Sequence, residues 1–166
     1  MIERYTRPEM GRIWEEENRY RAWLRVELAA CEALAARGEI PAEAMAAIRE
    51  RAAFDVVRIH EIEREVRHDV IAFLTSVSEH VGPAARYIHL GMTSSDVLDT
   101  ALALQLREAG ELLVDGIDGL LAAVKEKAFA YRDCPMIGRS HGIHAEPVTF
   151  GLKLAIWYEE LQRQRR

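Results

Sequence analysis

The sequence has little cysteine and few aromatic residues. Cys31 and Cys134 are the only cysteines among 166 residues, and aromatic side chains make up 7%. Two isolated thiols supply neither a disulfide framework nor a zinc ribbon, and they suit a reducing compartment. No apolar run approaches the roughly 18 residues that a membrane span needs, and the N-terminus lacks the apolar centre of a signal peptide. We therefore expect a cytoplasmic protein with no membrane partner.

Positive charge is also in deficit. Lysine and arginine number 22 against 27 acidic residues, which gives a formal net charge of -5. This balance disfavours a nonspecific nucleic-acid binder, so we expect no nucleic-acid partner. Hydrophobic residues make up 49% of the chain. The length suits one domain or slightly more, with a core of its own.

Apolar residues recur at spacings of three and four through most of the chain, which is the period of amphipathic helices. After Pro8, one stripe from Ile13 to Leu34 predicts a long helix that stops at Gly38. Three more helices are expected: one with Pro41 in its first turn, one capped by Asp55, and one that carries His68 and stops near Gly82-Pro83.

The longest pattern runs from Leu98 to Tyr131, with apolar steps of three and four that approach a 3.5-residue repeat. A helix of this length spans about 50 Å and is typical of bundles. Thr149 to Arg166 predicts a last amphipathic helix without a stop signal; it ends either naturally in a basic tail or by truncation, which we favour. We predict an all-α fold, with a helical N-terminal domain over 1–93 and the start of a long-helix bundle over 94–166.

A polar, glycine-containing segment over 138–147 interrupts the helical pattern. Glycine lets a ligand approach the backbone closely, and histidine carries protons near physiological pH. Ser140 and His141 are therefore candidates for an anion and proton-transfer site. The alternative is that the segment is a solvated turn between two helices with no functional role. A metal site of His141, His144 and Glu146 is disfavoured, because no Cys pair or His-Glu-x-x-His helix accompanies it; we expect no metal.

Other polar clusters have two interpretations each. Thr93-Ser94-Ser95-Asp96 precedes the longest helix, so it is a cap, either alone or with a bound carboxylate. Taken alone, Arg67-His68-Asp69 is interpreted as the polar face of a helix. His89 is ambiguous in the same way, between a structural role and a functional one. Arg4-Tyr5 is a frayed end unless something folds it over a phosphate. His60 and His80 are interpreted as surface or satisfied histidines.

Two segments resemble a known family. Residues 93–100, Thr-Ser-Ser-Asp-Val-Leu-Asp-Thr, resemble the first motif region of the fumarase/aspartase superfamily, and residues 138–147 resemble the second. Gly-Ile-His-Ala-Glu-Pro after His141 is similar to the adenylosuccinate lyase branch, and so is the opening segment 2–10. The resemblance covers the whole chain.

The resemblance implies an activity and an assembly. Enzymes of this branch release fumarate from adenylosuccinate, which leaves AMP, and from the succinylated aminoimidazole carboxamide ribotide of purine biosynthesis. The reaction needs no metal or organic cofactor. The partner is then a small nucleotide substrate, and the assembly is a homotetramer in which three subunits build each active site.

The resemblance also implies residue roles. His141 is the general acid, with His68 the first alternative. Ser140, Thr93 and Ser94 hold the succinyl carboxylates. The nucleotide, chiefly near its phosphate, is contacted by Arg4, Tyr5, Arg67, His68 and Asp69. His89 lies near the site without a defined role.

One part of the family pattern is missing. The catalytic base is a serine on a mobile loop with the pattern Ser-Ser-x-Met-Pro-x-Lys-x-Asn-Pro, and no such string occurs in the 166 residues. We therefore expect an N-terminal fragment that is inactive in isolation. Two rival interpretations remain: another lyase of the superfamily, and a non-catalytic helical scaffold supported by the long seam from Leu98 to Tyr131.

Overall fold

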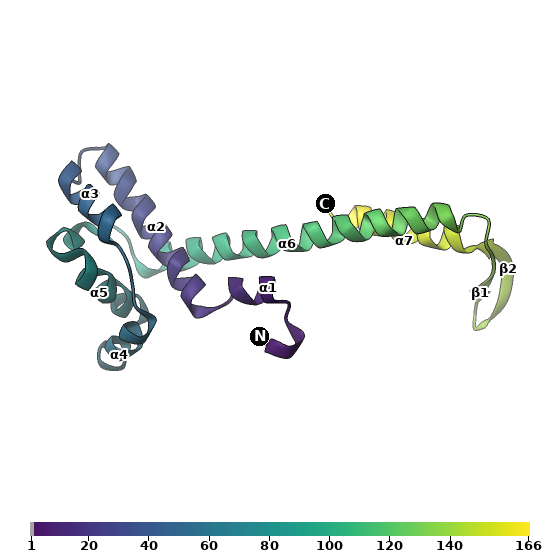
Figure 1. Cartoon of the computed structure of the whole chain (residues 1–166), viewed down its shortest axis with the longest axis horizontal. Coiled ribbons are helices and arrows are strands. Elements are labelled where there is room, and N and C mark those ends of the chain that lie inside the picture. The colour runs from purple at the N-terminus through teal and green to yellow at the C-terminus, as the bar shows by residue number, and fades with distance from the viewer. Residues whose placement is uncertain (1) are drawn as a thin grey trace. The chain divides into compact units, whose positions relative to one another are not determined.

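The computed structural model describes residues 2–166. In chain order its elements are η1 (Glu3–Tyr5), α1 (Pro8–Ile13), α2 (Glu16–Ala36), α3 (Ala42–Arg51), α4 (Val56–Val66), α5 (Asp69–Val81), η2 (Gly82–Tyr87), α6 (Ser94–Ala130), β1 (Pro135–Ser140), β2 (Ile143–Thr149) and α7 (Phe150–Gln164). The predicted helical class is confirmed (Figure 1). The chain divides into two compact units within α6, Met1–Ala109 and Gly110–Arg166. The domain boundary predicted after residue 93 stays a prediction.

The first unit encloses a core between α2, α3, α4 and α5. Tyr20 and Phe73 are fully buried and stack with ring centroids 5.7 Å apart. Trp23 meets Tyr20 edge-on at 5.1 Å and Phe73 edge-on at 5.5 Å. Such aromatic pairs contribute about 0.5–1.5 kcal/mol each beyond the area they bury. The core is therefore centred on the apolar stripe of α2 that the sequence predicted.

Local signals set several helix ends as expected. The Asp55 carboxylate accepts a hydrogen bond from the Arg58 N–H at 2.8 Å and caps α4. Gly38, with φ 77°, follows the C-cap of α2, which is the left-handed position that favours glycine. Pro41 differs slightly from expectation: it is the N-cap of α3 and precedes the first turn.

The predicted long helix after Pro8 is wrong in one respect, because it is two helices. α1 ends at Ile13 and α2 begins at Glu16. The Ile13 carbonyl accepts hydrogen bonds from Gln105 Nε2 at 2.6 Å and from Asn18 Nδ2 at 3.0 Å. Side chains from elsewhere thus satisfy this carbonyl where the helix stops. Periodicity alone could not reveal the break, since the apolar stripe continues across it.

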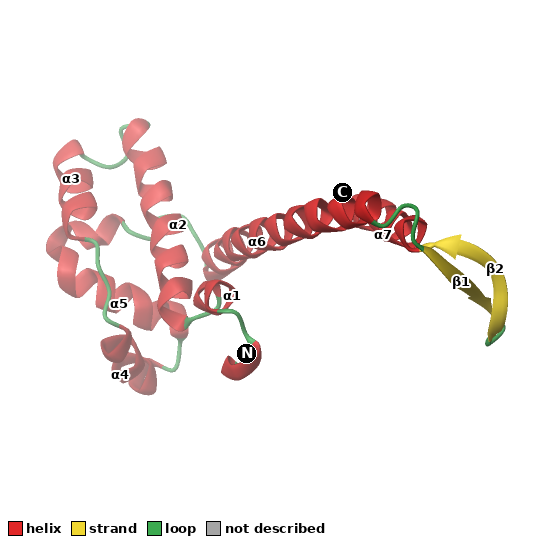
Figure 2. Cartoon of the chain, turned by 45° about the vertical axis from the view of Figure 1, so that its right-hand side comes forward, coloured by secondary structure: helices red, strands yellow, loops and turns green. Residues whose placement is uncertain are grey.

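In the second unit α7 lies alongside the C-terminal part of α6, and Figure 2 shows the two strands beyond them in yellow. The Phe150 N–H donates to the Cys134 carbonyl and the Gly151 N–H to the Tyr131 carbonyl, both at 2.9 Å. A Cβ at Gly151 would collide with the carbonyl oxygen of Ala128 and the backbone of Arg132. Glycine therefore allows the close approach of α7 to α6.

The predicted non-helical segment is an antiparallel hairpin. Its register pairs Pro135 with Thr149 at the open end and Ser140 with Ile143 at the tip. None of the helices in residues 2–166 combines the length and apolarity that crossing a bilayer requires.

Candidate active site

Within residues 2–166, three residues other than glycine have a positive φ: Arg67 at 53°, His89 at 65° and His141 at 52°. All three belong to the clusters that the sequence singled out. Side chains other than glycine adopt this left-handed conformation at an energetic cost, and such residues gather at functional sites. Backbone geometry thus marks three residues that the sequence analysis named as candidates, one of which, His141, lies in a motif segment.

The tip of the hairpin carries the strongest candidate. β1 ends at Ser140 and β2 begins at Ile143, so His141 and Gly142 form a two-residue turn. Both have positive φ, 52° and 77°, which is the type I′ geometry that matches the twist of the strands. Ser140, His141 and Ile143 are all exposed. The turn therefore holds an imidazole and a hydroxyl at an accessible, well-defined tip.

Gly138, on β1 before the turn, lies at an irregularity in the strand pairing. The register shifts between Ile137 and Arg139, and a Cβ on Gly138 would lie 2.7 Å from the Glu146 carbonyl oxygen. Glycine at 138 is therefore needed for the strands to pair. Among residues 2–166, no three His, Cys, Asp or Glu side chains gather closely enough to hold a metal ion.

The Arg67-His68-Asp69 cluster lies at the junction of two helices, so its interpretation as a polar helix face is wrong. Arg67 is the left-handed C-cap of α4, and His68 is the N-cap of α5. His68 Nδ1 accepts the Ile71 N–H at 3.4 Å, and the Asp69 carboxylate accepts the Val70 N–H at 2.7 Å. A neutral His68 whose Nδ1 accepts carries its proton on Nε2, from where a half-exposed ring can donate.

The start of α6 is capped as predicted. The Thr93 N–H donates to Asp96 Oδ2 at 2.8 Å, and the Asp96 N–H donates to the Thr93 carbonyl at 3.0 Å. This cap uses backbone groups and a carboxylate, and does not require the hydroxyls of Thr93 and Ser94. Those hydroxyls stand at the positive end of a long helix, where an anion is favoured.

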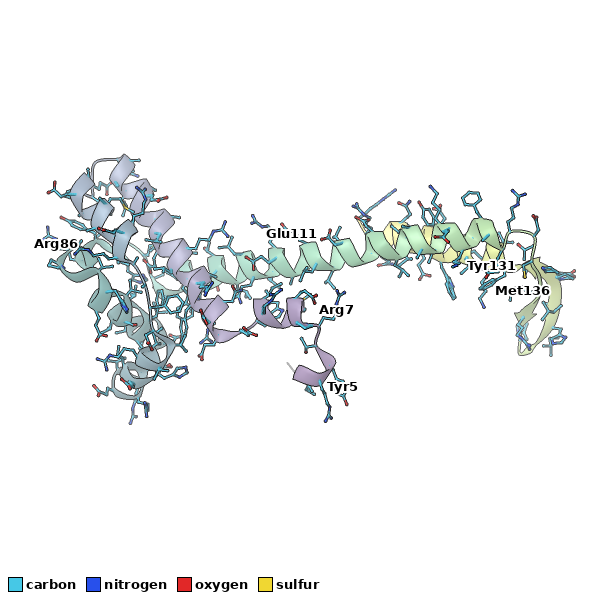
Figure 3. All side chains as sticks on the ribbon, in the orientation of Figure 1. Tyr5, Arg7, Arg86, Glu111, Tyr131 and Met136 are labelled. Atoms are coloured by element: carbon cyan, nitrogen blue, oxygen red, sulfur yellow. The ribbon has the colours of Figure 1, made fainter. Side chains whose placement is uncertain are left out.

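The N-terminal segment presents Arg4 and Tyr5 on η1. The Arg4 guanidinium lies 4.8 Å from the centroid of the Tyr5 ring, a cation–π contact. Tyr5 is 74% exposed, and Figure 3 shows it and Arg7 on this segment. Thr6 Oγ1 donates to the Ile2 carbonyl at 2.8 Å and closes the turn. The pair is thus ordered locally and open to a ligand.

His89 has a buried partner that the sequence reasoning missed. Glu27 Oε1 lies 2.6 Å from His89 Nδ1, and Glu27 Oε2 accepts the His89 N–H at 2.9 Å. The Glu27 side chain is 1% exposed. A signal was present, because Glu27 lies four residues from both Trp23 and Cys31 on the apolar stripe of α2. A carboxylate at a core position requires a partner.

Burial alters the acidity of two groups here. It raises the pKa of Glu27 above its ordinary value, and the hydrogen bonds from His89 offset part of that rise. Burial, with smaller contributions from the charges of Glu27 and Glu32, raises the pKa of the Cys31 thiol to about 11. Cys31 is therefore protonated at neutral pH and is a packing residue, not a nucleophile.

The candidates fall in both units. Arg4, Tyr5, the 67–69 cluster, His89 and Thr93-Ser94 belong to the first, and Ser140-His141 belongs to the second. Among them are imidazoles that can transfer protons, hydroxyls at a helix N-terminus, and arginines that can bind an anion. This set of groups suits an elimination from an anionic substrate.

Two relatives of this chain are named adenylosuccinate lyase. The chain is 58% identical over 99% of its length to an adenylosuccinate lyase of Synechocystis sp., and 52% identical over 98% to one of Bacillus subtilis. It spans 38% of the length of each.

Solved structures agree as well. A fumarate lyase from Mesorhizobium sp. matches 94% of this chain and 38% of its own, with a TM-score of 0.88 and 32% identity. A 3-carboxy-cis,cis-muconate lactonizing enzyme from Pseudomonas putida matches 97% of this chain and 38% of its own, with a TM-score of 0.88 and 33% identity. A family profile described as Lyase matches residues 3–166. The chain belongs to this lyase family.

Proposed function

We propose that the protein carrying this chain is an adenylosuccinate lyase of purine biosynthesis. It releases fumarate from adenylosuccinate to leave AMP, and from the succinylated aminoimidazole carboxamide ribotide to leave the carboxamide. Relatives of that name at 58% and 52% identity support the substrate. The observation that carries the chemistry is the exposed Ser140-His141-Gly142 tip, where a type I′ turn presents the imidazole.

The reaction divides between a base and an acid. The base removes a proton from Cβ of the succinyl group, the C–H electron pair forms the double bond of fumarate, and the C–N bond breaks. The leaving nitrogen receives the bond's electron pair and a proton. His141 supplies that proton, with His68 as the alternative acid. By resemblance the base is a serine on a mobile loop outside these residues.

Other side chains are proposed to bind the substrate. Hydroxyls of Ser140, Thr93 and Ser94 hold the succinyl carboxylates, where negative charge grows during proton removal. Arg4, Tyr5, Arg67, His68 and Asp69 contact the nucleotide, chiefly near its phosphate. Local arginine and histidine thus attract an anionic substrate to a protein whose net charge is -5. The proposed reaction uses no metal or organic cofactor.

The proposed assembly is a homotetramer in which each site draws on three subunits. Large apolar side chains along α6 support it: Leu113 is 62% exposed and Phe129 is 67% exposed. The hairpin tip is likewise exposed in the chain. Cys31 and Cys134 are free thiols, which is compatible with the cytoplasmic location that we propose.

The test is a steady-state assay of the full-length protein with adenylosuccinate, with fumarate and AMP measured as products. A second arm offers a carboxylated muconate, because one similar structure is a muconate lactonizing enzyme. Equal release of fumarate and AMP supports the proposal. Turnover of the muconate alone would favour the other superfamily reaction, and failure to bind any nucleotide would favour a scaffold.

A further inference from the structure

Glu27 is an unusual residue for the centre of a helical core. It lies on α2 with its side chain 1% exposed, beside the buried side chains of Trp23 and Cys31. Removing a carboxylate from water is costly, so a buried one persists only where specific groups bind it. None of the proposed catalytic or binding steps uses Glu27.

Both Glu27 oxygens bind the same distant residue. Oε2 accepts the His89 backbone N–H at 2.9 Å, and Oε1 lies 2.6 Å from His89 Nδ1. The two residues are 62 positions apart in the chain. One carboxylate therefore holds both the backbone and the ring of His89, which determines where the imidazole lies as well as how it is turned.

The backbone that Glu27 holds is strained. His89 has φ 65°, a left-handed conformation that a β-carbon disfavours, and Gly91 follows with φ 75°. This turn lies just before Thr93 and Ser94, the candidate carboxylate-binding residues at the start of α6. The bond to the His89 N–H stabilises the turn there, as expected where strain serves a site.

The same contact determines which ring nitrogen carries a proton. Burial favours the protonated form of Glu27, but the hydrogen bonds from His89 oppose this and favour the ionised form. An ionised carboxylate only accepts hydrogen bonds, so with Glu27 ionised the His89 Nδ1 that faces it carries hydrogen. Nε2 is then the nitrogen available to a ligand. The His89 side chain is 20% exposed, against 1% for Glu27, so the ring reaches from the buried carboxylate to the surface.

We propose that Glu27 is a positioning residue that holds His89 with Nδ1 protonated and so offers Nε2 to the substrate. This inference rests on the proposed function for the identity of the substrate. It explains the buried carboxylate of Glu27, since the histidine of such a pair is oriented by the group that binds its other ring nitrogen.

Glu27→Gln in the full-length enzyme is the sharpest test, because the amide has nearly the same volume. When its oxygen accepts the His89 N–H, its NH₂ faces Nδ1, which must then give up its proton. We expect kcat/KM to fall about 10- to 100-fold. This is the range found when the hydrogen-bond partners that orient metal-binding histidines are removed. Glu32→Gln is the matched control, because Glu32 lies on the same helix, is exposed and binds Arg49 at 2.8 Å. Its kcat/KM should stay near wild type.

A direct readout separates positioning from mere stability. Solid-state ¹⁵N NMR of histidine-labelled enzyme, assigned by a His89→Asn variant, should show a protonated Nδ1 in wild type and an unprotonated one in Glu27→Gln. His89→Asn tolerates the positive φ and keeps a donor toward Glu27 but lacks Nε2, so it should lose activity without unfolding. Glu27→Gln added to His89→Asn should cause little further loss.

Three results would overturn the inference: an unprotonated His89 Nδ1 in wild type, full kcat/KM in either folded variant, or an additive loss in the double variant. The wild-type spectrum and His89→Asn remain informative if Glu27→Gln does not fold. Failure of the proposed function has a different signature, because wild type would then not cleave adenylosuccinate while the spectrum still reports on Nδ1.

Discussion

The two units of the chain bury their apolar residues very differently. In the first, Tyr20, Phe73 and Ile48 are fully buried between short helices that cover one another. In the second, Leu113, Leu120 and Phe129 on α6 and Trp157 on α7 are 48–67% exposed. Exposed patches of this kind mark interaction surfaces. The first unit therefore has a large enclosed core, and the second leaves more of its large apolar side chains exposed.

The candidate residues follow the same contrast. Most proposed binding groups belong to the first unit. The proposed acid, His141, stands at the exposed tip of a hairpin in the second unit. The exposed tip and the exposed apolar side chains of α6 therefore belong to the same unit.

Two phenylalanines test the contrast in packing. Phe73→Ala removes a fully buried ring and should lower the free energy of unfolding of the chain by about 3–5 kcal/mol. Phe129→Ala, at 67% exposure, should change it by less than about 0.5 kcal/mol. Urea denaturation followed by circular dichroism measures both. Equal losses would show that the second unit has a core of comparable quality.

Removal of the proposed acid should separate chemistry from binding. In the full-length enzyme, His141→Asn keeps a residue that accepts positive φ in the turn but removes the proton donor. We expect kcat to fall roughly 10²-fold or more, with a much smaller change in KM. His144→Asn on the neighbouring strand is the matched control and should lose far less. If kcat is retained in His141→Asn, the acid role moves to His68.

Substitution of Arg4, in the first unit, tests substrate binding. The substrate phosphate does not change during elimination, so its contacts are alike in the ground and transition states. Arg4→Ala in the full-length enzyme should therefore raise KM with little change in kcat. The loss of a charge-assisted hydrogen bond of about 1.5–3 kcal/mol predicts a rise of roughly ten- to a hundredfold. An unchanged KM in steady-state assays would place the phosphate elsewhere, with Arg67 the first alternative.

Among residues 2–166, an exposed ion pair in each unit lowers the pKa of a carboxyl. Arg58 on α4 donates to Glu79 on α5 at 2.8 Å, and Arg165, the C-cap of α7, donates to Asp118 on α6. The hydrogen bond from each arginine holds the pKa of its carboxyl below the ordinary value, 4.5 for Glu79 and 3.8 for Asp118. A carboxyl with a depressed folded pKa stabilises the protein above its unfolded pKa, and this is lost as pH falls through the folded pKa.

We therefore expect the smallest effects from Glu79→Gln and Asp118→Asn. Each should lower the Tm slightly at neutral pH, and the difference from wild type should shrink as the pH falls below the ordinary pKa of the group and vanish only below its depressed folded pKa. Thermal melts across the acid range measure this. A difference that persists at the lowest pH would assign the effect to packing and not to charge.

Much of this protein was determined by local sequence. Apolar spacing placed most helices, Asp55 and Gly38 marked ends where a side chain or a positive φ satisfies the backbone, and the pattern over 138–147 excluded a helix. These signals succeed because they act over a few residues. The resemblance of two motifs to a superfamily added the candidate site, whose residue roles stay predictions.

Tertiary structure decided what depends on residues far apart in the chain. At the break after Ile13, the carbonyl of this residue is bound by Gln105, 92 positions further along the chain. The bond between Glu27 and His89 joins positions 62 residues apart. Helical spacing indicated that Glu27 is buried. Its partner could be identified only in the folded chain, because long-range hydrogen bonds form where packing brings donor and acceptor together.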